Sequence, residues 1–469
     1  QLLYKSNKYI KSPEGKIDLL WVILIIILII ITRFLYLKEH PFLTWGDELW
    51  ETGLESIAIF RGEIKNLYLV GYPDPYRTPS MGLITPLIPA LLVPFFAHTA
   101  YMYRIPAALF GAFDILLVYF ICRRYINRSV ALFSALSLIA LPIHIYFSRS
   151  ELVFTFDIFM TTLIIYLLFL TRQYFLDNRY WLSVMGLVFG FTLTCHPSAR
   201  IIALVALGIT LVLYTTRVFT DKHQTAKFLT WVKYIVLVSV FILIGYGPKI
   251  LFLSQSKFLH SQGSVILQDV DSAQLARFDP EALQKLQKNI VSFITDRYRL
   301  SFLGYIKEPL TNLVQFHYTE EKPLLPPLLA FFFLVGLIGA WHSPSPITRW
   351  FALFALIIPL THSALTPDLN WSYRTFVASS SSAVLIGVGL WQIISRIYVK
   401  VYRYILVAVF CLYIFLIITR FFILEPHMFN RPVEEYMTTH LSYFLAEELD
   451  PGRFHHLCLR VAPHQLLFL

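Results

Sequence analysis

Charged side chains are scarce in this chain. Asp, Glu, Lys and Arg make up 14% of its 469 residues and hydrophobic residues make up 57%, whereas ordinary soluble domains are about 25% charged. This balance excludes a soluble enzyme. Cysteine is also rare, and Cys122, Cys195, Cys411 and Cys458 form no CxxC pair, so the sequence indicates neither a disulfide framework nor a zinc finger.

Long basic tracts are missing as well, although the formal net charge is +10. Basic residues lie in short clusters between apolar runs, as at Arg123, Arg124 and Arg128. This distribution is typical of the cytoplasmic loops of membrane proteins, and it argues against nucleic acid as a partner. The aromatic share of 16% fits side chains that face lipid and the bilayer boundary.

Long apolar runs are what the sequence has instead. A helix that crosses about 30 Å of hydrocarbon needs about 20 mostly apolar residues. No small-residue cleavage site follows the first run, so we expect an uncleaved anchor. The predicted fold is an all-α, polytopic membrane protein with about 11 transmembrane helices. Their ranges are 17–37, 104–122, 129–147, 152–171, 180–197, 199–216, 231–253, 324–341, 347–365, 375–395 and 403–424.

The basic residues before the first span place the N-terminus in the cytoplasm, and each later cytoplasmic connection is then basic too. The apolar stretch 81–97 is short and broken by prolines, so we expect an interfacial or re-entrant segment there. Residues 1–424 form the transmembrane module, with outer loops 38–103 and 254–322. Residues 425–469 form a short extracytoplasmic tail or a truncated soluble domain.

Each large outer loop is predicted to contain a helix. Residues 47–60 read as an amphipathic helix that lies on the membrane surface, so the first outer loop is expected to hold interfacial helices. Residues 279–294 begin with Asp279 and have Pro280 at the first helical position, as helix starts often do.

Ionisable residues in the spans are informative because each costs about 2.5–3.5 kcal/mol at the centre of a membrane helix. Only Asp114 falls near mid-span, and we expect it to pair with a Tyr hydroxyl or a backbone group. The others lie at the outer ends of spans: Arg104, Arg149, Glu151, Asp157, His196, Arg200, Lys249, Asp368 and Arg374. Such residues often snorkel or pair structurally. Their recurrence on one side favours chemistry there, since Arg binds phosphate and a carboxylate accepts a hydroxyl proton.

Several short motifs follow one another along the chain. They are TrpGlyAspGlu (45–48), ArgGlyGlu (61–63), TyrArgThrProSer (76–80), ArgIleProAlaAlaLeuPheGly (104–111), SerArgSerGlu (148–151), HisProSerAlaArg (196–200) and TrpSerTyrArg (371–374). In this order they resemble the GT-C superfamily of integral-membrane glycosyltransferases, in particular the branch of the protein mannosyltransferases and lipid A aminoarabinose transferases.

The resemblance implies an inverting glycosyltransferase that takes a sugar from a polyprenyl-phosphate donor. It implies Asp47 as the catalytic general base toward an acceptor hydroxyl, with Glu48 beside it. The implied substrate-binding residues are Arg149, Glu151, Asp157, His196, Arg200 and Arg374. The reaction would take place on the extracytoplasmic side of the plasma (inner) membrane, with a glycan, lipid or protein as acceptor.

The resemblance also implies that no metal or other cofactor is needed, although acids in outer loops are able to bind Mg²⁺ or Mn²⁺. The chain departs from the family in two places. The loop 254–322 is too short for the β-trefoil domain of many protein mannosyltransferases, and Thr375 follows Arg374 where the family has Tyr.

Two other functions stay open at this point. A membrane transporter or lipid flippase is also polytopic, and it would show a polar path through the midplane around Asp114. A lipid-linked glycan ligase or polymerase would use a larger saccharide donor, and composition does not separate it from a single-sugar transferase.

Overall fold

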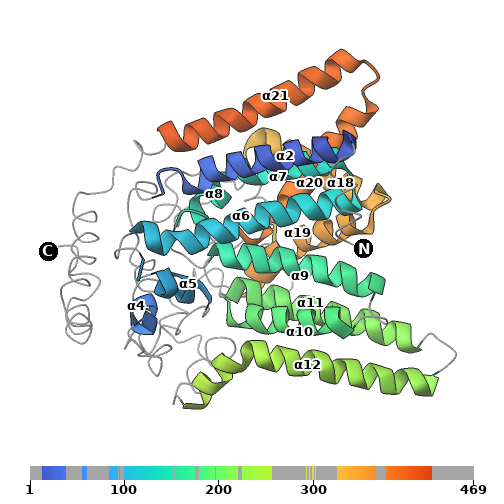
Figure 1. Ribbon diagram of the computed structural model, residues 1–469. Helices are drawn as coiled ribbons and strands as arrows, with labels where there is room; N and C mark the ends of the chain where they lie inside the picture. The colour runs from blue at the N-terminus through green and yellow to red at the C-terminus, as the bar shows by residue number, and fades with distance from the viewer. Residues whose placement is uncertain are drawn as a thin grey trace.

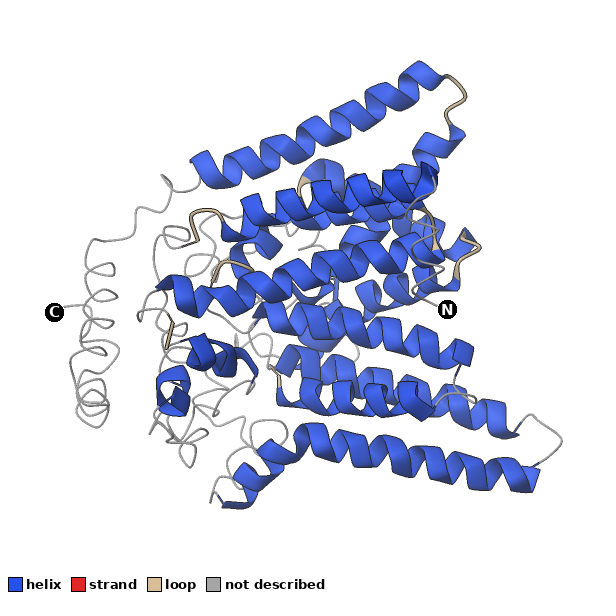
Figure 2. Cartoon of the chain, in the orientation of Figure 1, coloured by secondary structure: helices blue, strands red, loops and turns tan. Residues whose placement is uncertain are grey.

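The computed structural model describes eleven longer stretches of the chain and a few single positions between 292 and 302. The stretches are 13–37, 55–60, 84–92, 94–95, 100–150, 154–174, 179–195, 197–219, 224–255, 325–365 and 376–424. Every regular element in them is a helix (Figure 2).

The helices pack side by side as a bundle (Figure 1). Their bounds are α2 Pro13–Ile29, η1 Ile30–Phe34, α4 Glu55–Phe60, α5 Ile84–Leu92, α6 Ala100–Tyr125, α7 Arg128–Ala140, α8 Pro142–Phe147, α9 Phe154–Tyr174, α10 Arg179–Thr194, α11 Pro197–Phe219, α12 Gln224–Gln255, α18 Pro327–His342, α19 Pro346–Leu365, α20 Ser379–Arg396, α21 Lys400–Thr419 and η5 Arg420–Leu424. The elements η1 and η5 are π-helical turns that extend α2 and α21.

Each predicted span coincides with helical structure in the described part of the chain. Four described stretches are long and apolar enough to cross a membrane: Gly15–Phe34, Met102–Tyr125, Phe376–Arg396 and Lys400–Ile423. Shorter apolar helices accompany them: Arg128–Ala140, Phe154–Leu170, Tyr180–Thr194, Ala199–Val212, Val232–Gly247, Pro327–His342 and Pro346–Pro359. The chain is therefore an all-α, multi-pass membrane protein.

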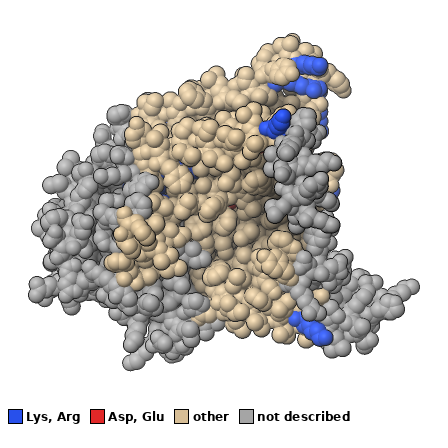
Figure 3. Space-filling model, viewed as in Figure 1, with Lys and Arg blue, Asp and Glu red and all other residues tan. Residues whose placement is uncertain are grey.

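The helices run between two ends of the bundle (Figure 1). At one of them, Asp18 forms ion pairs with Arg123 at 2.7 Å and with Arg128 at 2.6 Å. The Ser345 hydroxyl donates to the carbonyl of Tyr125 at 2.7 Å. Two connections that were predicted to be cytoplasmic therefore meet at this end, which we call the Asp18 end. On the face shown in Figure 3, most Lys and Arg side chains of the described residues lie toward it.

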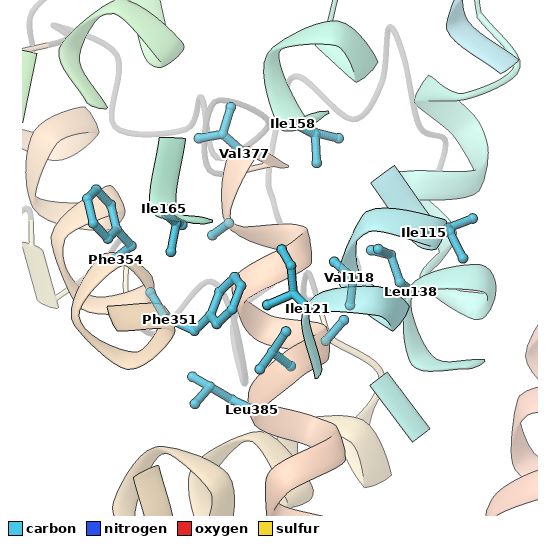
Figure 4. Packing of buried hydrophobic residues seen from close by; sticks show 14 of the residues in the cluster. Ile115, Val118, Ile121, Leu138, Ile158, Ile165, Phe351, Phe354, Val377 and Leu385 are labelled. Atoms are coloured by element: carbon cyan, nitrogen blue, oxygen red, sulfur yellow. The ribbon is translucent and has the colours of Figure 1, made fainter. Parts of the chain in front are cut away.

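The core lies where α6, α7, α9, α19 and α20 meet (Figure 4). The side chains there are aliphatic or phenyl groups, such as Val118, Leu138, Ile165, Phe351 and Leu385, and each is fully buried. Helices α2 and α21, in contrast, keep many apolar side chains exposed, as helices that face lipid do.

The predicted span 129–147 differs from the structure, because it is broken into α7 and α8 at Leu141. The physical reason is Pro142, which has no N–H to continue the helical hydrogen bonding and takes the first position of α8. The carbonyl of Leu138, which would accept from residue 142 in an unbroken helix, is thereby released.

Helix α5 covers part of the predicted interfacial or re-entrant stretch 81–97. Its nine residues are about 13 Å long, too short to cross the hydrocarbon. Helix α4 covers the end of the predicted helix 47–60, and both α4 and α6 pack against α5. Residues 47–54, the predicted helix 279–294 up to residue 291, and the tail 425–469 lie outside the described residues.

Helices α18 and α20 cross at close range through glycine. A Cβ atom on Gly336 would collide with the carbonyl oxygen of Leu385, and one on Gly389 with that of Phe332. We therefore expect Gly336→Ala to destabilise the protein by about 1–3 kcal/mol. Gly208→Ala is the matched control, since no atom lies near a Cβ at that position. Thermal unfolding in detergent, followed by tryptophan fluorescence, measures both, and equal midpoints would contradict the prediction.

Candidate functional site

Three of the predicted site residues lie in the described part of the chain, namely Arg149, Asp157 and Arg200. They lie at the end of the bundle opposite Asp18, which we call the Arg149 end. The other predicted site residues lie outside the described residues: Asp47, Glu48, Glu151, His196 and Arg374. The roles predicted for all of them stay predictions.

Arg149 follows α8 and is fully buried. Its Nη1 donates to the carbonyl of Thr32 at 3.1 Å, and its Nη2 donates to those of Leu35 and Tyr36, both at 2.8 Å. The ring of Phe422 lies 4.9 Å from its Cζ. Because a helix end leaves its last carbonyls without partners, this guanidinium serves as a cap for the end of the first span.

A second arginine holds the same segment. Arg104 on α6 donates from Nη1 to the carbonyl of Leu37 at 3.0 Å, and its side chain is buried. Between these contacts, Tyr36 adopts a positive φ of 53°, a conformation that costs a residue other than glycine roughly 1–2 kcal/mol. The chain thus leaves the first span along a fixed path, ten residues before Asp47.

Asp157 lies in the first turn of α9 and is fully buried. The start of α9 is tied to α8, because the Thr155 hydroxyl donates to the carbonyl of Phe147 at 2.6 Å. Phe147 and Phe154 both pack on Phe376, with ring centroids 5.2 and 4.9 Å away. The beginnings of α9 and α20 therefore meet α8 at the Arg149 end.

Arg200 lies in the first turn of α11, and its Nε donates to the carbonyl of Cys195 after α10. Its Nη2 is buried and has no hydrogen-bond partner among the described residues. A buried donor without a partner is rare in proteins and is a place where a ligand is expected.

Four buried polar side chains that were not among the predicted site residues form a connected row beside Arg149. The Nη2 of Arg33 lies 2.8 Å from Nδ1 of His144, whose Nε2 lies 3.4 Å from Oδ2 of Asp114. The Ser380 hydroxyl donates to the same carboxylate oxygen at 2.6 Å. All four residues are buried. Asp114 is thus paired, but with histidine and serine rather than with tyrosine or the backbone.

The sequence does contain a feature that points to this row of side chains. Arg33 and His144 are ionisable residues within apolar spans, and both fall in the half of the membrane where the other arginines gather. Within the described ranges, no three His, Cys, Asp or Glu side chains come together as a metal site.

A cavity of about 770 Å³ lies at the other end of the bundle. Its lining includes Tyr125, His342, Trp391 and Gln392, from the ends of α6, α18 and α20. Neither Asp114 nor Arg149 lines it, so this cavity is separate from the predicted site.

Comparison with known proteins bears on the fold. Residues 80–244, roughly a third of the chain, match the family model described as dolichyl-phosphate-mannose-protein mannosyltransferase. No curated protein sequence matches the chain.

Solved structures match over nearly its full length. ArnT from Cupriavidus metallidurans bound to undecaprenyl phosphate superposes with a TM-score of 0.52 at 13% identity, over 97% of this chain and 77% of that one. The archaeal oligosaccharyltransferase AglB from Archaeoglobus fulgidus, in complex with an inhibitory peptide and a dolichol-phosphate, gives 0.51 at 14% identity, over 96% of this chain and 60% of that one. The chain therefore shares the fold of these two proteins, and residues 80–244 are similar to the dolichyl-phosphate-mannose-protein mannosyltransferase family model.

Proposed function

We propose that this protein is an inverting glycosyltransferase that moves a sugar from a polyprenyl-phosphate donor to an acceptor hydroxyl at the outer face of the plasma (inner) membrane. The observation that carries the proposal is the buried Nη2 of Arg200, which has no hydrogen-bond partner among the described residues. A guanidinium with unused donors is suited to a phosphate, because it stays charged and binds oxygen pairs through its fork.

The other arginines of this end are occupied differently. Arg33 and Arg149 both donate to backbone carbonyls, and Arg104 does so through Nη1. Arg200 donates to one carbonyl through Nε, and its outer Nη2 has no hydrogen-bond partner among the described residues, which makes it a donor for a ligand. The structures of ArnT and AglB support the chemistry, since the one contains undecaprenyl phosphate and the other a dolichol-phosphate.

In the proposed reaction, Asp47 accepts the proton of the acceptor hydroxyl while that oxygen attacks the anomeric carbon. The carbon–oxygen bond to the lipid phosphate breaks, and the polyprenyl phosphate leaves with its negative charge held by Arg200. Glu48, Glu151, Asp157, His196 and Arg374 are proposed to complete the substrate site. The proposed reaction uses no metal ion or other cofactor.

The test is a transfer assay with the purified protein in lipid nanodiscs. Polyprenyl-phosphate sugars, each with a radiolabel in the sugar, are supplied with a panel of lipid, glycan and peptide acceptors, and release of free polyprenyl phosphate is measured. The proposal expects labelled acceptor and lipid phosphate in equal amounts. Transfer only from oligosaccharide donors would identify a ligase or polymerase instead. Movement of the intact lipid across a vesicle without bond cleavage would identify a flippase.

Arg200→Ala is expected to weaken the binding of polyprenyl phosphate by roughly 10- to 150-fold, because a hydrogen bond to a charged group contributes about 1.5–3 kcal/mol. Arg124→Ala is the matched control, since it also removes one positive charge, from an exposed residue in the last turn of α6 near the Asp18 end. Titration in nanodiscs with a fluorescent polyprenyl phosphate measures both constants. Equal affinities for the two variants would contradict the assignment of Arg200.

A further inference from the structure

Two arginines join the first span to the segment around α8. One extends from the span to the end of α7, and the other extends from the segment after α8 to the end of the span. Arg33 in η1 donates to the carbonyls of Leu138 and Ile139 at 3.1–3.2 Å, at the end of α7. Arg149 after α8 donates back to the carbonyls of Thr32 and its neighbours at the end of η1. Arg33 thus caps the end of α7, and Arg149 caps the end of the first span, where Arg33 lies.

The sequence explains why both ends need these donors. Pro142 leaves the carbonyl of Leu138 without its helical partner, and η1 ends before a residue with positive φ. The carbonyls of Leu138, Ile139 and Thr32 belong to fully buried residues, and a buried backbone acceptor without a partner is costly. A charged donor at a helix C-terminus also opposes the negative end of the helix dipole.

His144 orients the guanidinium of Arg33. A guanidinium only donates hydrogen bonds, so Nδ1 of His144 must be the acceptor of the 2.8 Å contact with Arg33. The ring hydrogen is then on Nε2, which faces Asp114 at 3.4 Å. The carboxylate is held in turn by Ser380 of α20. The Arg33 side chain is thereby connected to α8, α6 and α20.

We propose that Arg33, His144 and Asp114, together with Arg149, form a clasp that fixes residues 32–37, where the chain leaves the first span ten residues before Asp47. These are positioning residues, because the contacts of Arg33, His144 and Asp114 are with protein groups. The inference rests on the proposed function for its kinetic consequence only. The clasp itself concerns the path of residues 32–37.

Two variants of His144 separate this role from general packing. His144→Leu removes the acceptor for Arg33, whereas His144→Asn places a carboxamide oxygen near the former Nδ1 and keeps it. Asp18→Asn is the control for the same helix, since it weakens the ion pairs of α2 at the opposite end. Hydrogen exchange of the amides in 35–48 is followed by mass spectrometry without any donor present.

We expect His144→Leu to speed exchange over 35–48 by about tenfold or more, and His144→Asn and Asp18→Asn to stay within about threefold of the parent. In the transfer assay, His144→Leu should lower kcat by about 10- to 100-fold with KM for the lipid donor nearly unchanged, because a misplaced base affects the transition state more than binding. His144→Asn should restore most of kcat.

Parent-like exchange over 35–48 in His144→Leu would overturn the clasp whatever the protein catalyses. If instead no sugar donor is transferred by the parent but exchange behaves as expected, the proposed function is wrong and the clasp stands. Arg33→Lys is the second variant in case His144→Leu does not fold. It keeps the charge but replaces a fork with a single ammonium, so exchange over the same amides should again rise by about tenfold.

Discussion

Replacement of Asp47 by Asn is expected to lower the rate of sugar transfer by roughly 10²–10⁴-fold, the usual contribution of a positioned general base. The amide has nearly the shape of the carboxylate but does not accept the proton of the attacking hydroxyl. The loss should appear in kcat, with KM for the lipid donor within about threefold of the parent, because proton transfer belongs to the transition state. The measurement is initial-rate kinetics of transfer in nanodiscs.

Two variants control this experiment. Glu48→Gln is expected to cost less, about tenfold, if the neighbouring acid only supports the site electrostatically. Asp18→Asn makes the same chemical change at the opposite end of the first span and should leave kcat unchanged, since Asp18 pairs with Arg123 and Arg128 at that end. Transfer at nearly the parent rate by folded Asp47→Asn protein would show that the base is another residue.

Hydropathy predicts the helices of this protein well, because about 20 apolar residues in a row have few alternatives to a helix in lipid. The break at Leu141 was missed, although Pro142 stands in the middle of the predicted span. Hydropathy averaged over a whole span does not reveal that a single proline lacks the N–H needed to continue the helix. What decides the break is whether other donors reach the released carbonyls, and the donor here comes from Arg33, more than 100 residues away along the chain.

Side-chain partners were harder to predict than helices for the same reason. Asp114 was expected to be paired, and it is, but its partners are His144 and Ser380 from α8 and α20. Nothing in a single sequence records which helices are neighbours. The ionisable residues of the spans do show which end of the bundle is polar, and Arg149, Asp157 and Arg200 do lie at one end.

The pairing of Asp114 also bears on the transporter alternative. A polar path through the midplane needs groups that water reaches, whereas Asp114 is fully buried, accepts a hydrogen bond from Ser380 and lies 3.4 Å from Nε2 of His144. The cavity of about 770 Å³ lies at the Asp18 end, and Asp114 does not line it. These contacts favour a structural role for the one ionisable residue that the sequence placed near mid-span.

Arg149→Leu is expected to yield no folded protein, because it removes the donor of the carbonyls of Thr32, Leu35 and Tyr36 together. Thr32 is buried, and leaving its carbonyl without a partner costs about 1–3 kcal/mol. The partly buried carbonyls of Leu35 and Tyr36 add to this cost, which is a large share of the roughly 5–15 kcal/mol by which a typical protein is stable. Arg149→Lys should fold, but an ammonium does not span three carbonyls as a guanidinium does. Its midpoint of unfolding should fall by at least about 4 °C.

Arg149→Lys also separates the two roles that this residue is given. The sequence predicts that Arg149 binds substrate, whereas its observed contacts are with the backbone of the first span. If the backbone role dominates, the unfolding midpoint and kcat fall together while KM for the lipid donor stays within about threefold. A rise of KM by about tenfold at an unchanged midpoint would instead assign the guanidinium to the lipid phosphate. Arg124→Lys, which changes an exposed arginine near the Asp18 end, should alter neither quantity. A positioning arginine thus changes kcat, whereas an arginine that binds the lipid phosphate changes KM. The comparison requires a variant that folds.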